Sequence, residues 1–145
     1  MKRKGSYFEY EQDRNEELLK AYHKAIASCK VIRLEDIWKD IADMPTSRFW
    51  VSEERAAIII SRMIKGDTLE YMRPCKREMF HEIYKRVVRL RLQKPELSIY
   101  KLCFTVINQP AEKFYMTPLS IRETIYKIKR DFYKERKKKL KFMTM

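Results

Sequence analysis

Apolar side chains recur every three or four residues along most of this 145-residue chain. Leu18, Tyr22, Ala25 and Ile26, for example, lie on one face of a helix with about 3.6 residues per turn. The same period is found in five further segments, so the pattern predicts an all-α protein. We expect helices over residues 15–28, 34–42, 80–92 and 98–108, and two more that begin at residues 52 and 117.

The second half of this pattern repeats the first half at an offset of 65 residues. The stretch RFWVSEERA, which begins at Arg48, corresponds to KFYMTPLSI, which begins at Lys113. Both stretches follow a proline, Pro45 or Pro110, and both place two aromatic residues just before a helix. Apolar positions of all three helices correspond at this offset without a gap. We therefore predict an internal duplication of a three-helix unit.

Helix start and stop signals support this division. Ser52 and Thr117 are good N-cap residues for the two third helices, and Pro118 suits the first helical position. Gly66 suits the end of the first unit's third helix, because glycine readily adopts the left-handed conformation found there. Pro74 lies ahead of the second unit's first helix.

The predicted fold is thus all-α, with two tandem three-helix, helix-turn-helix-like units and a basic C-terminal helix extension. The expected boundaries are an N-terminal unit at 1–66, a linker at 67–78, a C-terminal unit at 79–130 and a basic tail at 131–145.

Each connection between a second and a third helix carries two neighbouring aromatic residues. We predict that Phe49 and its copy Phe114 pack under the junction and set the angle between the two helices. Trp50 and its copy Tyr115 suit either a half-buried hinge or a stacking contact, because each ring is amphipathic. We favour the hinge.

The net charge of the chain is the strongest indication of the kind of partner it binds. The chain has 33 Lys and Arg against 20 Asp and Glu, a net charge of +13. Such a surplus on a small protein favours a polyanionic partner. Residues 127–141 alone hold nine basic and two acidic side chains. No apolar run is long enough for a membrane span, and no apolar segment follows the basic N-terminus, so we expect a cytoplasmic protein, nuclear in a eukaryote.

A three-helix unit with a short second helix, a connection and a third helix resembles the helix-turn-helix superfamily, here over about residues 14–65 and 79–130. The pairing of two such units is loosely similar to Myb-type repeats, although the regularly spaced tryptophans of that family are absent. A general likeness to phage small terminase subunits and mobile-element accessory proteins lies in small size, basic charge and helical content. The helix-turn-helix resemblance implies that the third helices contact the major groove of duplex DNA.

Candidate nucleic-acid-binding residues are the polar and basic side chains on the outward faces of the third helices, the cations of the two connections and the lysine-rich tail. They are Arg48, Arg55, Ser61, Arg62, Lys65, Lys113, Thr117, Arg122, Tyr126, Lys127, Arg130, Lys134, Arg136, Lys137, Lys138 and Lys139.

Catalytic and metal chemistry have no evident residues. The two histidines, His23 and His81, are not kept between the repeats, and two glycines cannot form a glycine-rich phosphate loop. No His, Cys and Asp spacing fits zinc. We expect no enzyme activity, no cofactor, no metal and no small-molecule substrate. The three cysteines are expected to be buried reduced thiols.

Two other functions remain open at this stage. The chain could be a helical adaptor or assembly protein that binds other proteins or itself, or it could bind RNA. Glu53 and Glu54 favour a difference between the two units, because two carboxylates at the start of a third helix are unfavourable beside phosphates. The first unit would then bind a protein and the second unit the nucleic acid.

Overall fold

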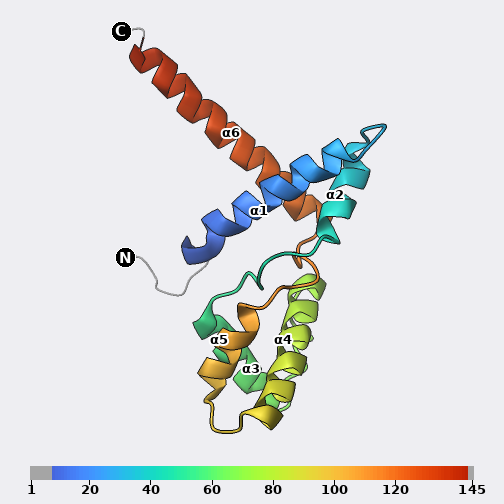
Figure 1. Cartoon of the computed structure of the whole chain (residues 1–145), viewed down its shortest axis with the longest axis vertical. Helices are drawn as coiled ribbons and strands as arrows, with labels where there is room; N and C mark the ends of the chain where they lie inside the picture. The colour runs from blue at the N-terminus through green and yellow to red at the C-terminus, as the bar shows by residue number, and fades with distance from the viewer. Residues whose placement is uncertain (1–7, 144–145) are drawn as a thin grey trace.

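A computed structural model of the chain describes residues 8–143 (Figure 1). These residues form six helices and no β-strand, which confirms the all-α prediction. The helices are α1 (Phe8–Ala27), α2 (Leu34–Ala42), α3 (Glu53–Ile64), α4 (Pro74–Gln93), α5 (Ile99–Ile107) and α6 (Pro118–Met143).

The helix ends follow the local signals in the sequence. The Ser52 side chain accepts a hydrogen bond from the Arg55 amide at 3.2 Å, and Thr117 accepts one from the Ser120 amide at 3.1 Å. These bonds satisfy amides that a helix N-terminus leaves without a partner. Gly66 follows α3 with a φ of +106°, a backbone conformation that suits glycine.

The helix bounds also keep the 65-residue offset. α2 and α5 have nine residues each and start at 34 and 99, while α3 and α6 start at 53 and 118. The expected linker at 67–78 is too long, however, because α4 already begins at Pro74. The segment between α3 and α4 is also not a loose linker, since Leu69 is fully buried. Leu34, expected to face inward, is 45 % exposed.

The helices are not grouped as the repeat suggests. α3 packs against α5 and α4, whereas α6 packs against α2 and α1. Figure 1 shows the resulting bundles at opposite ends of the molecule: α1, α2 and α6 in one, and α3, α4 and α5 in the other. We had expected each third helix to pack on the first two helices of its own unit. The third helices are instead exchanged between the repeats.

This exchange corrects the helix-turn-helix prediction. In that motif, the second helix braces the third helix that follows it in the chain. Here α2 braces α6 and α5 braces α3, and no packing occurs between α2 and α3. The bundle of α3, α4 and α5 is therefore a contiguous piece of chain, in which successive helices pack together as they commonly do. The other bundle joins the two ends of the described chain.

The exchange is possible because the two connections are long and run side by side. Residues 43–52 and 108–117 cross at Thr46 and Ala111, which donate backbone hydrogen bonds to each other's carbonyls at 3.0 Å. These two residues are exactly 65 positions apart, so a pair of equivalent residues meets face to face.

Neighbouring aromatic residues in each connection enter opposite cores. Phe49 is buried with α3, α4 and α5, and Trp50 is buried with α1, α2 and α6. In the second connection, Phe114 joins the core of Trp50, and Tyr115 stacks on Phe49 with ring centroids 5.9 Å apart. The burial of all four rings confirms a structural role. They tie the two bundles together rather than set one interhelical angle.

A buried polar network fixes the first connection to α1. Trp50 donates its indole N–H to the Thr46 hydroxyl at 2.9 Å, and Thr46 donates to the Glu17 carboxylate at 3.1 Å. Ser47 donates to the same carboxylate with its amide at 3.0 Å and with its hydroxyl. Thr46 is only 5 % exposed, so its bonds have no substitute in water.

Replacing Thr46 with valine should therefore lower the free energy of unfolding by about 1–3 kcal/mol, because the buried Trp50 N–H loses its acceptor. Denaturant unfolding followed by tryptophan fluorescence measures this loss. Thr46→Ser keeps the hydroxyl and is the matched control, for which we expect a smaller loss. A larger loss in Thr46→Ser than in Thr46→Val would show that the methyl group, not the hydrogen bond, matters.

The cysteines were expected to be buried, and this is correct only for Cys103. Cys29 and Cys75 are half-buried, and all three are free thiols. Burial raises the pKa of Cys103 from its ordinary value of 9.0 to about 11. A raised pKa in the folded state means that folding favours the protonated thiol.

We expect this contribution to stability to be complete below pH 9 and to be lost as the pH rises from about 9 to about 11. Urea midpoints measured across this window should fall in the wild type. The decline should be shallower in Cys103→Ala, which carries no thiol to ionise. A parallel decline in both proteins would assign the pH dependence to other groups.

Candidate nucleic-acid interface

The second half of α6 extends beyond its bundle. Ile121 and Ile125 are buried between α1 and α2, Ile128 is half-buried, and every residue from 130 to 143 is exposed. Figure 1 shows this part of α6 running past α1 and away from both bundles. We call residues 130–143 the α6 extension. The buried residues of α6 all lie in the turns that precede this extension.

Basic side chains form a continuous stripe along α6. At about 100° per residue, six positions from 127 onward fall within a face about 100° wide, and all six carry Lys or Arg. All six are exposed, and together they span about 21 Å of helix at 1.5 Å per residue. The basic stripe consists of Lys127, Arg130, Lys134, Lys137, Lys138 and Lys141.

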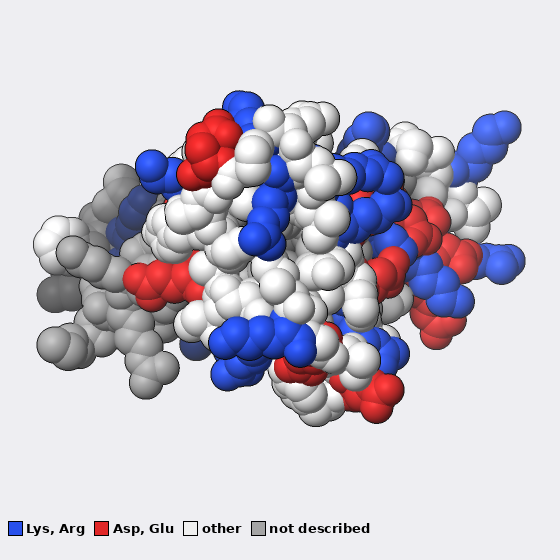
Figure 2. Space-filling model, turned by 90° about the horizontal axis from the view of Figure 1, so that it is seen from below, with Lys and Arg blue, Asp and Glu red and all other residues white. Residues whose placement is uncertain are grey.

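Among the six helices, α6 carries the largest excess of positive charge, and α4 follows with six Lys and Arg against two Glu. α6 holds ten Lys and Arg against three Asp and Glu, whereas α1 holds five Asp and Glu against three Lys and Arg. Figure 2 looks onto the end of the molecule formed by α3, α4 and α5, where blue and red side chains are interspersed around a white centre. The basic stripe thus gathers six cations on one face, with the single carboxylate of Asp131 at its edge.

The predicted cations of the two connections are used within the fold. The Arg48 guanidinium donates to the Phe49 and Val51 carbonyls at 3.0 and 2.8 Å, and lies over the rings of Tyr10 and Trp50. Desolvation by burial lowers the pKa of Arg48. Arg48 therefore stabilises the first connection, and its guanidinium is not placed to bind a phosphate at the start of α3.

Its copy Lys113 forms an ion pair with Glu78 at 2.7 Å, and this hydrogen bond raises the pKa of Lys113. Thr117, also a candidate, caps the N-terminus of α6. Its hydroxyl accepts a hydrogen bond from the Ser120 amide and donates one to the Ser120 hydroxyl. Neither residue is brought close to the basic stripe, because both lie at or before the start of α6.

The candidates on α3 lie in the other bundle. Arg55, Arg62 and Lys65 are exposed, and Ser61 is half-buried. Arg62 and Lys65 correspond by the repeat to Lys127 and Arg130, the first two members of the stripe. The two third helices thus share an exposed basic pair three residues apart. The two basic pairs lie in different bundles, so they do not form one continuous surface.

The candidates on the first turns of α6 are less uniform. Arg122 is exposed, but it lies to one side of the stripe. The Tyr126 ring packs edge-on against Trp38 of α2 with centroids 5.7 Å apart, which leaves the residue 46 % exposed. Lys129, between stripe positions, donates to the Tyr22 hydroxyl at 2.7 Å and lies over its ring.

The helix divides the basic tail that the sequence predicts as one block. Arg136 and Lys139 lie on the opposite side of α6 from the stripe, whereas Lys141, which is not among the predicted binding residues, belongs to the stripe. Helical spacing carried this information once α6 was known to be unbroken to residue 143. The sequence left the helix end undefined, because a run of lysines has no strong stop signal.

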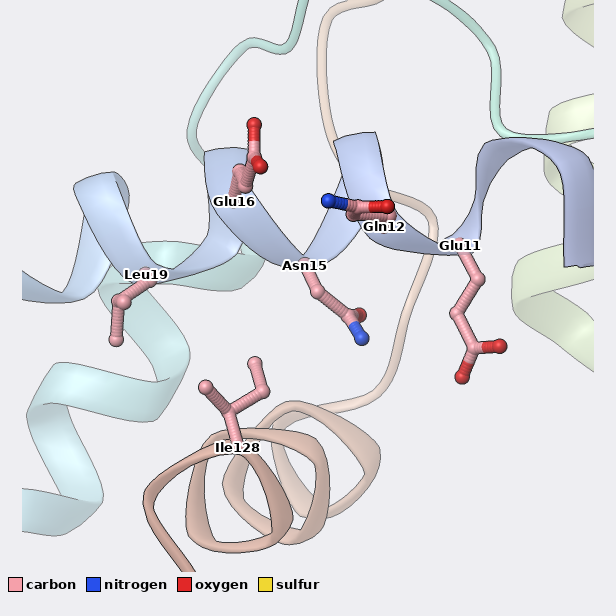
Figure 3. A pocket seen from close by; sticks show the side chains of 6 residues that line it. All are labelled: Glu11, Gln12, Asn15, Glu16, Leu19 and Ile128. Carbon is pink, nitrogen blue, oxygen red and sulfur yellow. The ribbon is translucent and has the colours of Figure 1, made fainter. Parts of the chain in front are cut away.

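A shallow groove of about 350 Å³ lies between α1 and α6, lined by Leu19 and Ile128 and by four polar residues of α1. Figure 3 shows Asn15 and Ile128 pointing toward one another across it, with Glu11 beside them.

Among residues 8–143, no group of three or more His, Cys, Asp or Glu could hold a metal ion. No helix within that range is long and apolar enough to cross a membrane.

Comparison of the chain with protein-family models, with curated proteins and with solved structures finds no match.

Proposed function

We propose that this protein binds duplex DNA through the basic stripe of α6. The supporting observation is the stripe itself: six exposed cations on one helix face, with no carboxylate among them from residue 127 onward. A single helix is narrow enough to enter the major groove, where flanking phosphates lie on both sides. Lys and Arg at this spacing supply phosphate contacts, which position a protein without reading a particular sequence.

α3 adds a second, weaker contact in this proposal. Its Arg62 and Lys65 repeat the basic pair that opens the stripe, and α3 is braced by α5 as α6 is braced by α2. Two contacts on one molecule raise the effective concentration of the second after the first has formed. Glu53 accepts a hydrogen bond from Tyr100 at 2.8 Å, so one of the two carboxylates at the start of α3 faces α5 rather than a ligand.

A fluorescence-anisotropy titration of the whole protein against a short labelled duplex tests the proposal. We expect binding at low salt, with an affinity that falls steeply as salt rises, because each neutralised phosphate releases counterions. With six stripe contacts, the slope of log affinity against log salt should be about −5. A protein with no affinity for duplex DNA at low salt would overturn the proposal.

Competition separates the remaining alternatives. Unlabelled duplex DNA should displace the probe, while structured RNA of the same length should compete less, because the deep, narrow groove of A-form RNA does not admit a helix. Stronger displacement by RNA would make this an RNA-binding protein. A protein adaptor would bind neither duplex DNA nor structured RNA.

A further inference from the structure

The α6 extension exposes apolar side chains as well as cations. Phe132, Phe142 and Met143 are 65 %, 85 % and 81 % exposed, and Tyr133 and Leu140 are also open to solvent. Phe132 lies on the side of α6 that continues the buried face of Ile121, Ile125 and Ile128, opposite the basic stripe, and Phe142 lies at the edge of that side, about 80° round the helix from Phe132. This side therefore has no partner within residues 8–143, although it continues the core.

The residues on this face have a self-complementary order. Phe132, Glu135, Lys139 and Phe142 are spaced by three, four and three residues, which is the spacing of a seam between two packed helices. When a second copy of the same helix runs antiparallel, Phe132 faces Phe142 of the second copy and Glu135 faces its Lys139. The two-fold axis then generates the same two pairs again.

We propose that two copies of this chain associate through antiparallel packing of their α6 extensions along this seam. An aromatic pair closes each end, and two Glu135–Lys139 ion pairs lie between them. The complementarity points to a second copy rather than to another protein, because each seam residue meets its chemical match in the same sequence. The inference does not depend on nucleic-acid binding.

Charge makes the association depend on salt. The extension holds seven Lys and Arg against two Asp and Glu, so two extensions repel each other at low ionic strength. The basic stripes face away from the seam on the two sides of the pair. We therefore expect the dimer to become tighter as salt rises, which is opposite to the salt dependence of DNA binding.

Sedimentation velocity of the full chain over a protein concentration series, at low and at high salt, tests the proposal. The wild type should shift from monomer to dimer, at lower concentration when salt is high. Phe132→Gln with Phe142→Gln should weaken the dimer about 100-fold, because both aromatic pairs are lost. Val31→Gln with Leu92→Gln is the matched control: these side chains are 74 % and 81 % exposed elsewhere, and their loss should leave the dimer unchanged.

Charge reversal gives the sharper test. Glu135→Lys or Lys139→Glu alone sets like charges opposite each other, and each should weaken the dimer about tenfold. The double variant Glu135→Lys with Lys139→Glu restores opposite charges across the seam and should recover the dimer. All these residues are exposed, so circular dichroism should show an unchanged fold. A wild type that stays monomeric, or a double variant no better than the single variants, would overturn the proposal.

Discussion

Replacing Lys134, Lys137, Lys138 and Lys141 with glutamine should lower the affinity of the protein for duplex DNA by about 100-fold or more at low salt. These four lysines form the part of the basic stripe that lies beyond the bundle, and all are exposed. Four fewer phosphate contacts should also reduce the slope of log affinity against log salt by about 3 to 4. Glutamine is a good helix former, so α6 should remain intact.

A control of equal charge separates the stripe from net charge alone. Lys30, Lys39, Lys76 and Lys101 are exposed on other elements, and replacing all four with glutamine removes the same charge. We expect this variant to lose less than tenfold in affinity. Anisotropy titrations of both variants over the same salt series make the comparison. Equal losses would show that the affinity for DNA depends on the net charge of the protein and not on the basic stripe of α6.

We also expect the bundle of α3, α4 and α5 to fold without the rest of the chain, whereas a single repeat should not fold. A fragment of residues 45–116 contains α3, α4 and α5 together with Phe49, Ala111 and Tyr115 of their core, and we expect it to unfold cooperatively. The fragment 1–66, which is one complete repeat, should not. Its α1 and α2 lack α6, and its α3 lacks α4 and α5, so each apolar face would be left in water.

Thermal unfolding followed by circular dichroism compares the fragments. The repeat fragments 1–66 and 67–145 should each show a weak, gradual transition, and their equimolar mixture should recover a cooperative one. A cooperative transition in fragment 1–66 alone would mean that α3 can pack within its own repeat. The exchange of third helices would then be one of two arrangements of similar stability.

The local structure could be predicted from the sequence because its causes are local. Apolar spacing located all six helices, and N-cap residues such as Ser52 and Thr117 located two of the starts closely. The starts of α1 and α4 were wrong, because α1 begins seven residues and α4 six residues before the expected position. The aromatic residues of the connections were expected to be structural, and they are buried. Leu34 was expected inside but is largely exposed, since periodicity places a residue on a face without saying how far that face is covered.

The candidate site was predicted less well, for a physical reason that differs between residues. Arg48 lies in a charged and aromatic stretch, and only folding shows that its donors bind the Phe49 and Val51 carbonyls. Lys113 likewise pairs with Glu78, which is 35 residues away in the chain. Lys134, Lys137 and Lys138 remain predicted binding residues, and all three are exposed on the α6 extension.

The sequence by itself determined the helices, the recurrence of its apolar pattern at an offset of 65 residues and the concentration of positive charge in the last helix. Only the tertiary structure decided which third helix belongs to which bundle. The apolar faces of α3 and α6 have the same spacing, so either helix fits either pair of partners by pattern alone. The choice depends on long-range contacts: the crossing at Thr46 and Ala111, the aromatic residues that enter opposite cores, and the buried Leu69 that holds α3 beside α4.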